Sequence, residues 1–463
     1  MRSLLCIALL LPGLGLGGPA RAQVHEFVLD NGLKLLVKED HRAPVVVSQV
    51  WYKVGSSYEH PGITGISHVL EHMMFKGTEN YPLGEFSRII AENGGSENAF
   101  TGADYTAYFQ TLEKTRLPVS FELEADRMRN LTLPPDEFAK EIEVVKEERR
   151  WRTDDNPQSA LYEVMKATAF QTSPYRHPII GWMHDLETMT VADLRRWYEK
   201  WYAPNNATLV VVGDVNPGDV LALAEKHFAP LPAGEMPAAD KQPEVPQQGM
   251  KRIVIRRPAE VPHLLMSYKV PVLISALDQP DRVPEWEPYA LEVLAGVLDG
   301  GNSARFASRL VRGQEIAAAI SVDYSLGARL DNILVISAVP AEGRTVAELE
   351  QAIRGEVVDL QSAPVSDAEL RRVKAQVVAD DVYERDSIFY QGMIIGILET
   401  VGLSWRHADE YVERVRAVTA DQIIAAAKKY LVDTGLTVAV LEPQPLDQAV
   451  RPPAGGGSAH GHE

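Results

Sequence analysis

The sequence predicts an α+β protein made of two similar mixed α/β domains joined by a proline-rich linker. Three observations predict this fold class: each half alternates strand-like and helix-like runs, a proline-rich segment separates the halves, and one pattern recurs at a long fixed spacing. A chain of 463 residues is also long enough for two domains of about 200 residues each.

The recurring pattern is a helical run followed by an apolar strand. Residues 190–202 read as the helix and residues 209–212 as the strand. A shift of 228 residues lays this pattern on residues 418–430 and 437–441. The alternative is a chance alignment of common valine, leucine and alanine patterns, which a constant shift over separated segments disfavours. The shift pairs Asp193 with Asp421 and Tyr202 with Tyr430.

The N-terminus reads as a targeting segment. Residues 1–22 combine Arg2, an apolar stretch and an Ala-x-Ala cleavage site, so we expect a cleaved signal peptide and a periplasmic protein. The only cysteine, Cys6, lies in this segment, so the mature chain would have no disulfide. No later apolar run is long enough to span a membrane.

A change in composition marks the boundary between the domains. Residues 229–249 are rich in proline and in small and polar residues, which indicates an extended linker. The linker divides an N-terminal domain at residues 23–228 from a C-terminal domain at residues 250–445. Residues 446–463 form a glycine- and histidine-containing tail that we expect to be disordered.

The most informative motif is His-Val-Leu-Glu-His at residues 68–72. In a helix, His68 and His72 lie on one face, so their imidazoles can bind one zinc ion. Glu71 points to the same side, where its carboxylate can act as a base toward a water on the metal. This reversed zincin motif is the inverzincin signature of hydrolysis by zinc. The alternative is a pair of structural histidines.

The surroundings of the motif favour a helix. Apolar residues recur at roughly helical spacing between Ile63 and Met73, which predicts an amphipathic helix with a core-facing side. Thr64 is expected to cap its N-terminus, and Gly77 is expected to end the run. The same 228-residue shift lays the motif on Gly-Val-Leu-Asp-Gly at residues 296–300, a copy without histidine.

A third zinc ligand is expected from an acidic run, since catalytic zinc sites usually have three protein ligands. The prolines and Asp136 indicate the start of a helix that carries this run. Glu141 and Glu148 lie seven residues apart and share one face of that helix. A solvated glutamate-rich surface is the alternative. Between the two motifs, residues 99–101 and 105–111 are β-prone and predict a hairpin.

Together these residues resemble the pitrilysin family, the inverzincin peptidases that include insulin-degrading enzyme and the mitochondrial processing peptidase. The similarity rests on His68-x-x-Glu71-His72, on Glu148 with Glu141 before it, and on an Asn-Ala-x-Thr segment after two glycines. It runs from about residue 25 to residue 445. Later matches are Tyr108, His177-Pro178, Gly181-Trp182 and Tyr202-x-Pro204-Asn205-Asn206.

The resemblance implies a zinc-dependent endopeptidase that hydrolyses short or unfolded peptides. It implies one Zn2+ per chain bound by His68, His72 and Glu148, with Glu71 as the general base and Glu141 as a carboxylate that orients the site. It also implies that the two domains together form one half of a clamshell around an enclosed chamber.

The resemblance also implies where substrate binds. Asn98, Ala99 and Phe100 would lie at an edge strand that receives the substrate backbone as an added strand. The bottom-up alternative for this segment is an ordinary hairpin.

The C-terminal half departs from the family at an Arg/Tyr pair that holds the substrate carbonyl in complete members. Arg312 is the candidate for the arginine, but the tyrosine position falls on Ala318 or Ala319, and Tyr324 is out of register. We therefore expect a paralogous peptidase-family subunit to supply the pair. The alternative is that another donor substitutes and the chain works alone or as a homodimer.

The formal net charge is −18 at pH 7, which disfavours nucleic acid or an acidic membrane surface as a partner. It mildly favours neutral or basic peptides, although such a charge commonly serves solubility alone. The alternative function is a non-catalytic peptide- or zinc-binding subunit of a peptidase-like complex. A pure binding subunit would have no need for Glu71.

Overall fold

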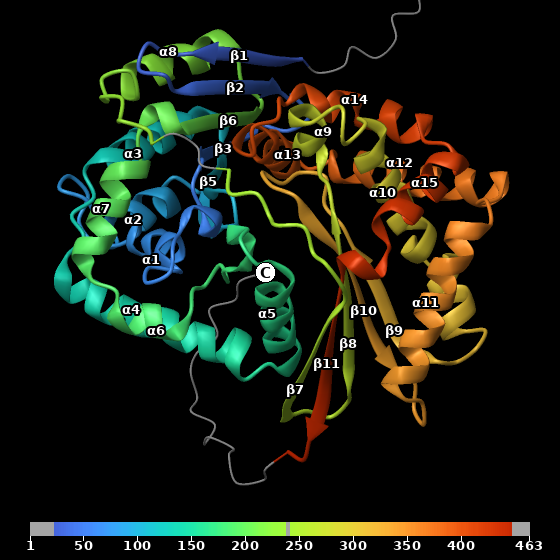
Figure 1. Cartoon of the computed structure of the whole chain (residues 1–463). Helices are drawn as coiled ribbons and strands as arrows, with labels where there is room; N and C mark the ends of the chain where they lie inside the picture. The colour runs from blue at the N-terminus through green and yellow to red at the C-terminus, as the bar shows by residue number, and fades with distance from the viewer. Residues whose placement is uncertain (1–22, 238–240, 447–463) are drawn as a thin grey trace, which may run out of the picture.

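The computed structural model describes residues 23–237 and 241–446. The expected signal peptide at residues 1–22 and residues 447–463 of the expected tail lie outside the described residues. The described chain forms two halves, each built on one mixed sheet with helices packed against it (Figure 1). The fold class predicted from the sequence is confirmed.

The N-terminal half contains a six-stranded sheet in the order β1-β2-β6-β3-β5-β4. β2 and β6 are parallel, and the other neighbours are antiparallel. Strand β4 is therefore an edge strand with one side free of strand partners. The strands are β1 (Val24–Val28), β2 (Lys34–Glu39), β3 (Val45–Tyr52), β4 (Ser96–Thr101), β5 (Thr106–Glu113) and β6 (Ala207–Gly213). The helices are α1 (Ile66–Met73), α2 (Glu85–Glu92), α3 (Leu117–Arg129), α4 (Pro135–Arg149), α5 (Pro157–Ala169), α6 (Met183–Thr188), α7 (Val191–Trp201) and α8 (Pro217–His227).

The C-terminal half repeats this topology with one strand fewer. Its sheet has the order β7-β11-β8-β10-β9, in which β7 and β11 are parallel and the rest are antiparallel. The strands are β7 (Lys251–Pro258), β8 (His263–Val270), β9 (Ala317–Asp323), β10 (Asn332–Pro340) and β11 (Leu436–Gln444). The helices are α9 (Leu273–Asp278), α10 (Trp286–Asp299), α11 (Val346–Ser362), α12 (Asp367–Glu384), α13 (Ile388–Thr400), α14 (Arg406–Ala417) and α15 (Ala420–Tyr430).

The internal repeat is present, but its register differs from the predicted one by one residue. Capping boxes open both α7 and α15, and they align Thr190 with Thr419 and Asp193 with Gln422. The shift is therefore 229 residues, and it also aligns the first residues of β6 and β11. The predicted pairing of Asp193 with Asp421 was wrong, because the side chain that closes the second capping box is a glutamine.

Helix α5 lies within the N-terminal half in sequence but packs on the sheet of the C-terminal half (Figure 1). Its buried residues Leu161, Met165 and Ala169 belong to the hydrophobic core formed around β8, β10 and β11. The core of the N-terminal half is separate and lies between its sheet and helices such as α1, α3 and α7. Helix α5 is therefore a physical bridge between the halves.

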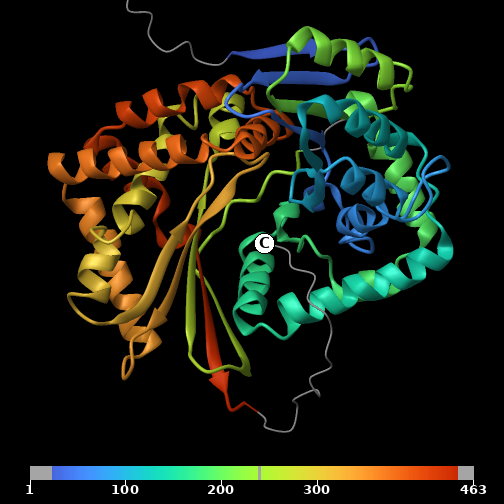
Figure 2. The same cartoon turned by 180° about the vertical axis from the view of Figure 1, so that it is seen from behind.

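Helix α13 makes a second bridge, from the C-terminal half to the other face of the N-terminal sheet (Figure 2). Ile395 packs with Trp51, Val210 and Val212, whose side chains point away from the main N-terminal core. The contact is close, because a Cβ atom added to Gly396 would lie 2.0 Å from Cε2 of Trp51.

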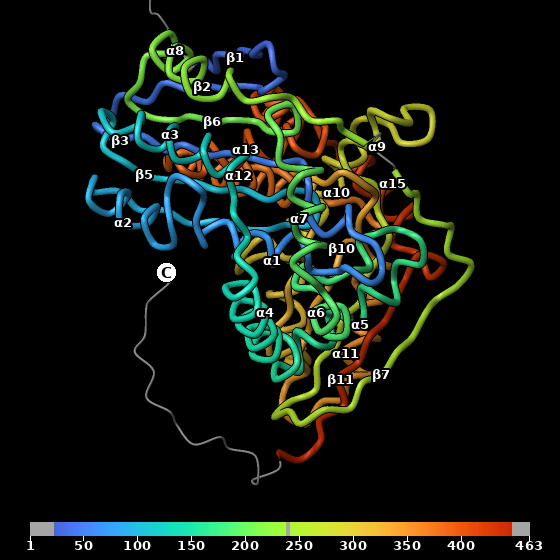
Figure 3. Tube along the Cα trace, turned by 90° about the vertical axis from the view of Figure 1, so that its left-hand side faces the viewer, coloured from blue at the N-terminus to red at the C-terminus, as the bar shows by residue number. Residues whose placement is uncertain are grey.

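Between α8 and β7, the described residues contain neither helix nor strand. This segment runs along the outside of the molecule before it enters β7 (Figure 3). Within residues 23–237 and 241–446, no helix has the length and apolar character needed to cross a membrane.

Candidate active site

The two histidines of the motif lie on α1, whose start differs from the expectation. The N-cap residue is Gly65, with φ of 87°, and not Thr64. The Thr64 hydroxyl is engaged elsewhere, since it donates to Oδ2 of Asp185 at 2.6 Å. The buried Glu59 carboxylate instead accepts the N–H groups of Gly65 and Ser67, at 2.7 Å and 2.9 Å. A carboxylate at this position also complements the positive end of the helix dipole.

Helix α4 begins next to the predicted prolines and brings the third candidate ligand to the histidines. Oε2 of Glu148 lies 3.7 Å from Nε2 of His68 and 3.4 Å from Nε2 of His72. One ligand atom from each of the three residues lies within 4.8 Å of the other two. Two imidazole nitrogens and one carboxylate oxygen are a donor set that fits zinc, with room for a further ligand.

Glu141 contacts His72 at the ring nitrogen that does not face Glu148. Its Oε1 lies 2.9 Å from Nδ1 of His72, and its Oε2 pairs with Nζ of Lys76 at 2.5 Å. This contact leaves Nε2 of His72 facing Glu148, which is the tautomer and orientation that metal binding requires. On the other side, Arg152 pairs with Oε1 of Glu148 at 2.8 Å.

The two histidines have opposite pKa shifts. Burial, with a smaller effect from His72, lowers the pKa of His68 to about 4. His68 is therefore neutral near pH 7, and its nitrogen is free to coordinate. Burial alone would also lower the pKa of His72, but contacts with Glu141 and Glu148 raise it to about 9. These carboxylates favour positive charge at His72, and a bound divalent cation would take the place of that proton.

Glu71 lies on the same helix as the histidines but makes a different contact. Its Oε2 accepts a hydrogen bond from the hydroxyl of Thr101, at the end of β4. Burial raises the pKa of Glu71 above its ordinary value, and the Thr101 hydrogen bond opposes this shift. A carboxylate with a raised pKa beside a metal site is suited to accept and return a proton.

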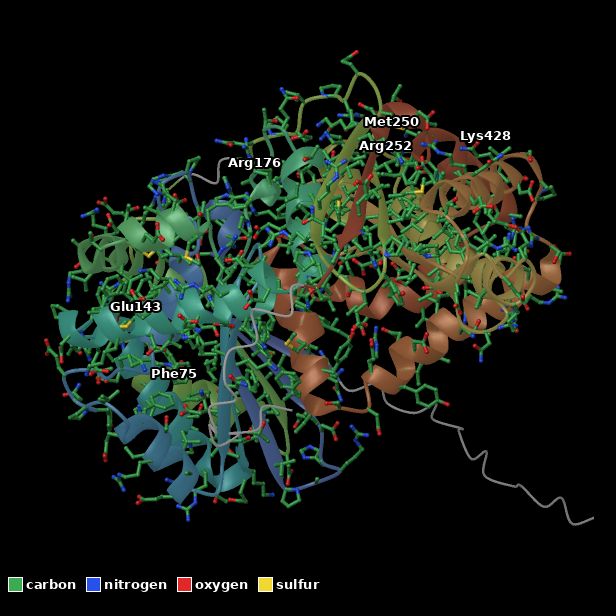
Figure 4. The ribbon with its side chains drawn as sticks, turned by 90° about the horizontal axis from the view of Figure 1, so that it is seen from below. Phe75, Glu143, Arg176, Met250, Arg252 and Lys428 are labelled. Carbon is green, nitrogen blue, oxygen red and sulfur yellow. The ribbon has the colours of Figure 1, made fainter. Side chains whose placement is uncertain are left out.

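A cavity of about 1120 Å³ opens beside these residues, between the two halves. On the N-terminal side, edge strand β4 lines it with Asn98, Ala99 and Phe100. Phe75, after α1, and Arg176, after α5, line it as well and are labelled in Figure 4. The opposite wall comes from β8, β9 and β10 of the C-terminal half.

Arg312 is placed away from these residues. It follows the short helix Phe306–Val311, is exposed, and donates from Nη2 to the carbonyl of Asn302. It is not among the residues that line the cavity. Tyr324 is half-buried, and its hydroxyl donates to the carbonyl of Pro271 at 2.8 Å. The structure therefore brings together all the predicted site residues of the N-terminal half, without Arg312.

Sequence reasoning missed four residues that support the site, namely Glu59, Lys76, Arg152 and Asp185. One of them carried a signal, since Arg152 lies four residues after Glu148, whereas Lys76 lies beyond the end of α1. That spacing places a side chain over the preceding helical turn. Glu59 and Asp185 gave no such signal, because their roles depend on the folding of loops.

Comparisons with known proteins give the class of the protein. A family profile described as "Insulinase (Peptidase family M16)" matches residues 34–182, and a profile described as "Peptidase M16 inactive domain" matches residues 188–377. The chain belongs to the M16 peptidase family, and the resemblance noted in the sequence is confirmed. The second description is consistent with the lack of a His-x-x-Glu-His motif in the second half.

Individual relatives extend over most of the chain. The zinc protease PqqE of Helicobacter pylori is 32% identical over 432 residues, which cover 90% of this chain and 93% of the relative. A crystal structure of a protease from Helicobacter pylori matches with a TM-score of 0.84 and 29% identity, over 91% of this chain and 100% of that one. The periplasmic protease PqqL from Escherichia coli shares the fold, with a TM-score of 0.74 and 19% identity, over 93% of this chain and 49% of that one.

Proposed function

We propose that the chain is a zinc-dependent endopeptidase that hydrolyses short or unfolded peptides. The observation that carries the proposal is the convergence of His68, His72 and Glu148, with Glu71 beside them, at a cavity bounded by an edge strand. Relatives named zinc proteases support the same class of activity.

In this proposal His68, His72 and Glu148 bind zinc, and Glu141 with Lys76 keeps His72 in its binding orientation. When bound, zinc would supply a Lewis acid that lowers the pKa of water toward neutrality. Glu71 takes the proton from the attacking water and returns it to the leaving amine. Its raised pKa makes Glu71 a better acceptor in the first transfer, and the leaving amine is basic enough to take the proton back. Thr101 fixes the carboxylate in place.

The substrate would bind by its backbone along β4. The free side of this edge strand faces the cavity that contains the zinc site, so an extended peptide can pair with residues 98–100. Most of the backbone of a folded protein is already paired, and a cavity of about 1120 Å³ between the halves does not admit a folded domain, which favours short or unfolded chains as substrates.

We also propose that a paralogous peptidase-family subunit completes the site. The position of Arg312 outside the cavity supports this, because the candidate for the arginine of the Arg/Tyr pair is then not at the site. The same proposal includes the predicted domain limits, at residues 23–228 and 250–445. It also includes export to the periplasm. The name of the Escherichia coli neighbour, a periplasmic protease, supports export.

Cleavage of quenched fluorescent peptides tests the proposal. The chain is purified through a tag, with any subunit that stays bound, as wild type, as Glu71→Gln and as the control Glu143→Gln. Glu143 is an exposed carboxylate on α4 that pairs, among the residues that the structure describes, only with Lys146 (Figure 4). We expect Glu71→Gln to lower cleavage at least about a hundredfold with zinc retained, and Glu143→Gln to match wild type.

Retained turnover in Glu71→Gln would contradict the mechanism. Zinc bound without cleavage by the purified wild-type assembly would instead favour the alternative of a non-catalytic peptide- or zinc-binding subunit.

A further inference from the structure

One face of helix α5 forms part of the cavity wall beside the zinc site. Gln158, Tyr162 and Lys166 line the cavity, and they lie four residues apart, which puts them on one side of the helix. The other side of α5 is packed into the core of the C-terminal half, so this wall is held rigidly.

Lys166 is a half-buried cation on this wall without an anionic partner. Among the described residues, its ammonium group has no hydrogen-bond acceptor and no carboxylate within ion-pair distance. Its Nζ lies 6.0 Å from the ring centroids of Tyr162 and Tyr175. Burial lowers the pKa of Lys166, and the negative charge of Asp104 opposes that shift.

Asp104 does not form an ion pair with Lys166, and other groups engage its carboxylate. Oδ1 accepts from the hydroxyl of Ser57 at 2.7 Å, and Oδ2 accepts from the hydroxyl of Tyr175 at 2.5 Å. The backbone N–H of Arg329 also donates to Oδ2, at 3.0 Å. This network fixes Asp104 where it is and leaves Lys166 facing the cavity.

The neighbouring cations of the cavity differ from Lys166 in this respect. Lys76 is paired with Glu141, and Arg152 is paired with Glu148. Arg176 is exposed at the rim and donates to the carbonyl of Gln171. Of these four cations, Lys166 is thus the one that is both partly desolvated and unpaired. An anion bound beside it would gain favourable electrostatic energy, and Lys166 would pay little further desolvation cost.

We propose that Lys166 is a specificity-determining residue that binds an aspartate or glutamate side chain of the peptide substrate. The inference rests on the proposed function, since it requires a peptide in the cavity beside β4. It assigns the substrate class more narrowly, to peptides with an acidic residue at one fixed distance from the cleaved bond.

Binding of fluorescent peptides to the full chain tests this without turnover, on the Glu71→Gln background. Peptides with a single glutamate at successive positions are compared with glutamine versions, each with an amidated and with a free C-terminus. We expect one position at which glutamate binds roughly tenfold tighter than glutamine, in amidated peptides as well. Lys166→Met is expected to abolish this preference and Lys166→Arg to keep it. Lys140→Met removes an exposed lysine on α4 and is expected to have no effect.

Two results would overturn the assignment: no preference for glutamate at any position, or a preference that survives Lys166→Met. A preference seen only with free C-termini would show that the terminal carboxylate binds instead, and would also overturn it. Thermal unfolding and zinc content show whether the variants are folded. Cleavage assays of the protein with Glu71 intact separate the two proposals. If no peptide is cleaved but binding still prefers glutamate, the peptidase proposal fails and the role of Lys166 in selecting acidic peptides stands. Turnover without glutamate preference contradicts only the role of Lys166.

Discussion

At the scale of single residues, the start of α1 depends on a backbone conformation that only glycine adopts without strain. Gly65 has φ of 87°, and a Cβ atom there would lie 2.5 Å from the carbonyl oxygen of Ile180. The close approach joins the loop before α6 to the helix that carries both histidines. Any shift at Gly65 is therefore transmitted directly to His68 and His72.

We expect Gly65→Ala to lower the free energy of unfolding by about 2 kcal/mol or more and to weaken zinc binding, because backbone strain and a steric clash act together. Gly62→Ala is the matched control, since Gly62 also has positive φ, at 99°, but has open space around it. It should cost about 1 kcal/mol and leave zinc binding intact. Urea unfolding and zinc titration measure both effects. Equal losses in the two variants would contradict a specific role for the contact with Ile180.

The sequence predicted the residues of the site better than the contacts that hold them. His68, Glu71 and His72 follow from helical spacing, which is local. The cap of α1 was predicted as Thr64 because a hydroxyl precedes an apolar run, but Asp185 engages that hydroxyl and Glu59 replaces it. Both carboxylates come from outside the helix, so only the folded chain reveals their roles.

At the scale of helices and strands, α13 of the C-terminal half packs closely against β3 of the N-terminal sheet. Gly396 lies against Trp51, which is fully buried. The two surfaces meet with no space for a methyl group.

We expect Gly396→Ala to destabilise the protein by roughly 1–3 kcal/mol, because the added methyl group overpacks a filled contact. Gly355→Ala is the control, since Gly355 is exposed within α11 and has open space around it. That change should be neutral or stabilising by up to about 1 kcal/mol, since alanine favours a helix. Thermal unfolding of both variants tests the difference, and a stabilising Gly396→Ala would exclude the close contact.

Element prediction succeeded where the pattern was local and failed where packing decided. Helices α4, α7 and α15 start at caps or prolines that the sequence displays. The repeat register was off by one residue, because aspartate and glutamine close equivalent capping boxes. The packing of α5 against the C-terminal half could not be predicted, because the apolar residues on its buried side are of types that would suit the core of either half.

At the scale of the whole molecule, the Glu244 carboxylate helps to anchor the segment between the halves. Glu244 accepts N–H groups from Gln171, Thr172 and Ser173, each at 2.9 Å, and forms an ion pair with Lys269 of β8. Burial alone would raise the pKa of Glu244, but the Lys269 ammonium and the three N–H donors lower it to about 2.

This shift predicts how stability depends on pH. The folded pKa lies below the ordinary value of 4.5, so the contribution of Glu244 is fully present above pH 4.5 and is lost as pH falls toward 2. We expect Glu244→Gln to cost about 2 kcal/mol at pH 7 and progressively less below pH 4.5. Glu442→Gln, which breaks an exposed pair with Arg256, should cost under about 0.5 kcal/mol at either pH. Urea unfolding at pH 7 and pH 3 decides, and a pH-independent loss in Glu244→Gln would contradict this account.

Net charge and the cavity wall lead to different expectations about the substrate. The value of −18 mildly favours neutral or basic peptides, whereas the role that we propose for Lys166 favours acidic ones. Net charge sums the whole surface, but a substrate meets only the groups that line its site. The sequence could not place Lys166 there, because its position depends on α5 crossing between the halves.

The most direct test of the central claim is the zinc content of the purified wild-type chain, Glu71→Gln and Glu148→Gln, measured after dialysis at a fixed free zinc concentration. The account predicts one zinc per chain in wild type and in Glu71→Gln, and a large loss in Glu148→Gln, because Glu148 is a ligand and Glu71 is a base. Equal zinc loss in both variants, or a full equivalent of zinc in Glu148→Gln, would contradict it.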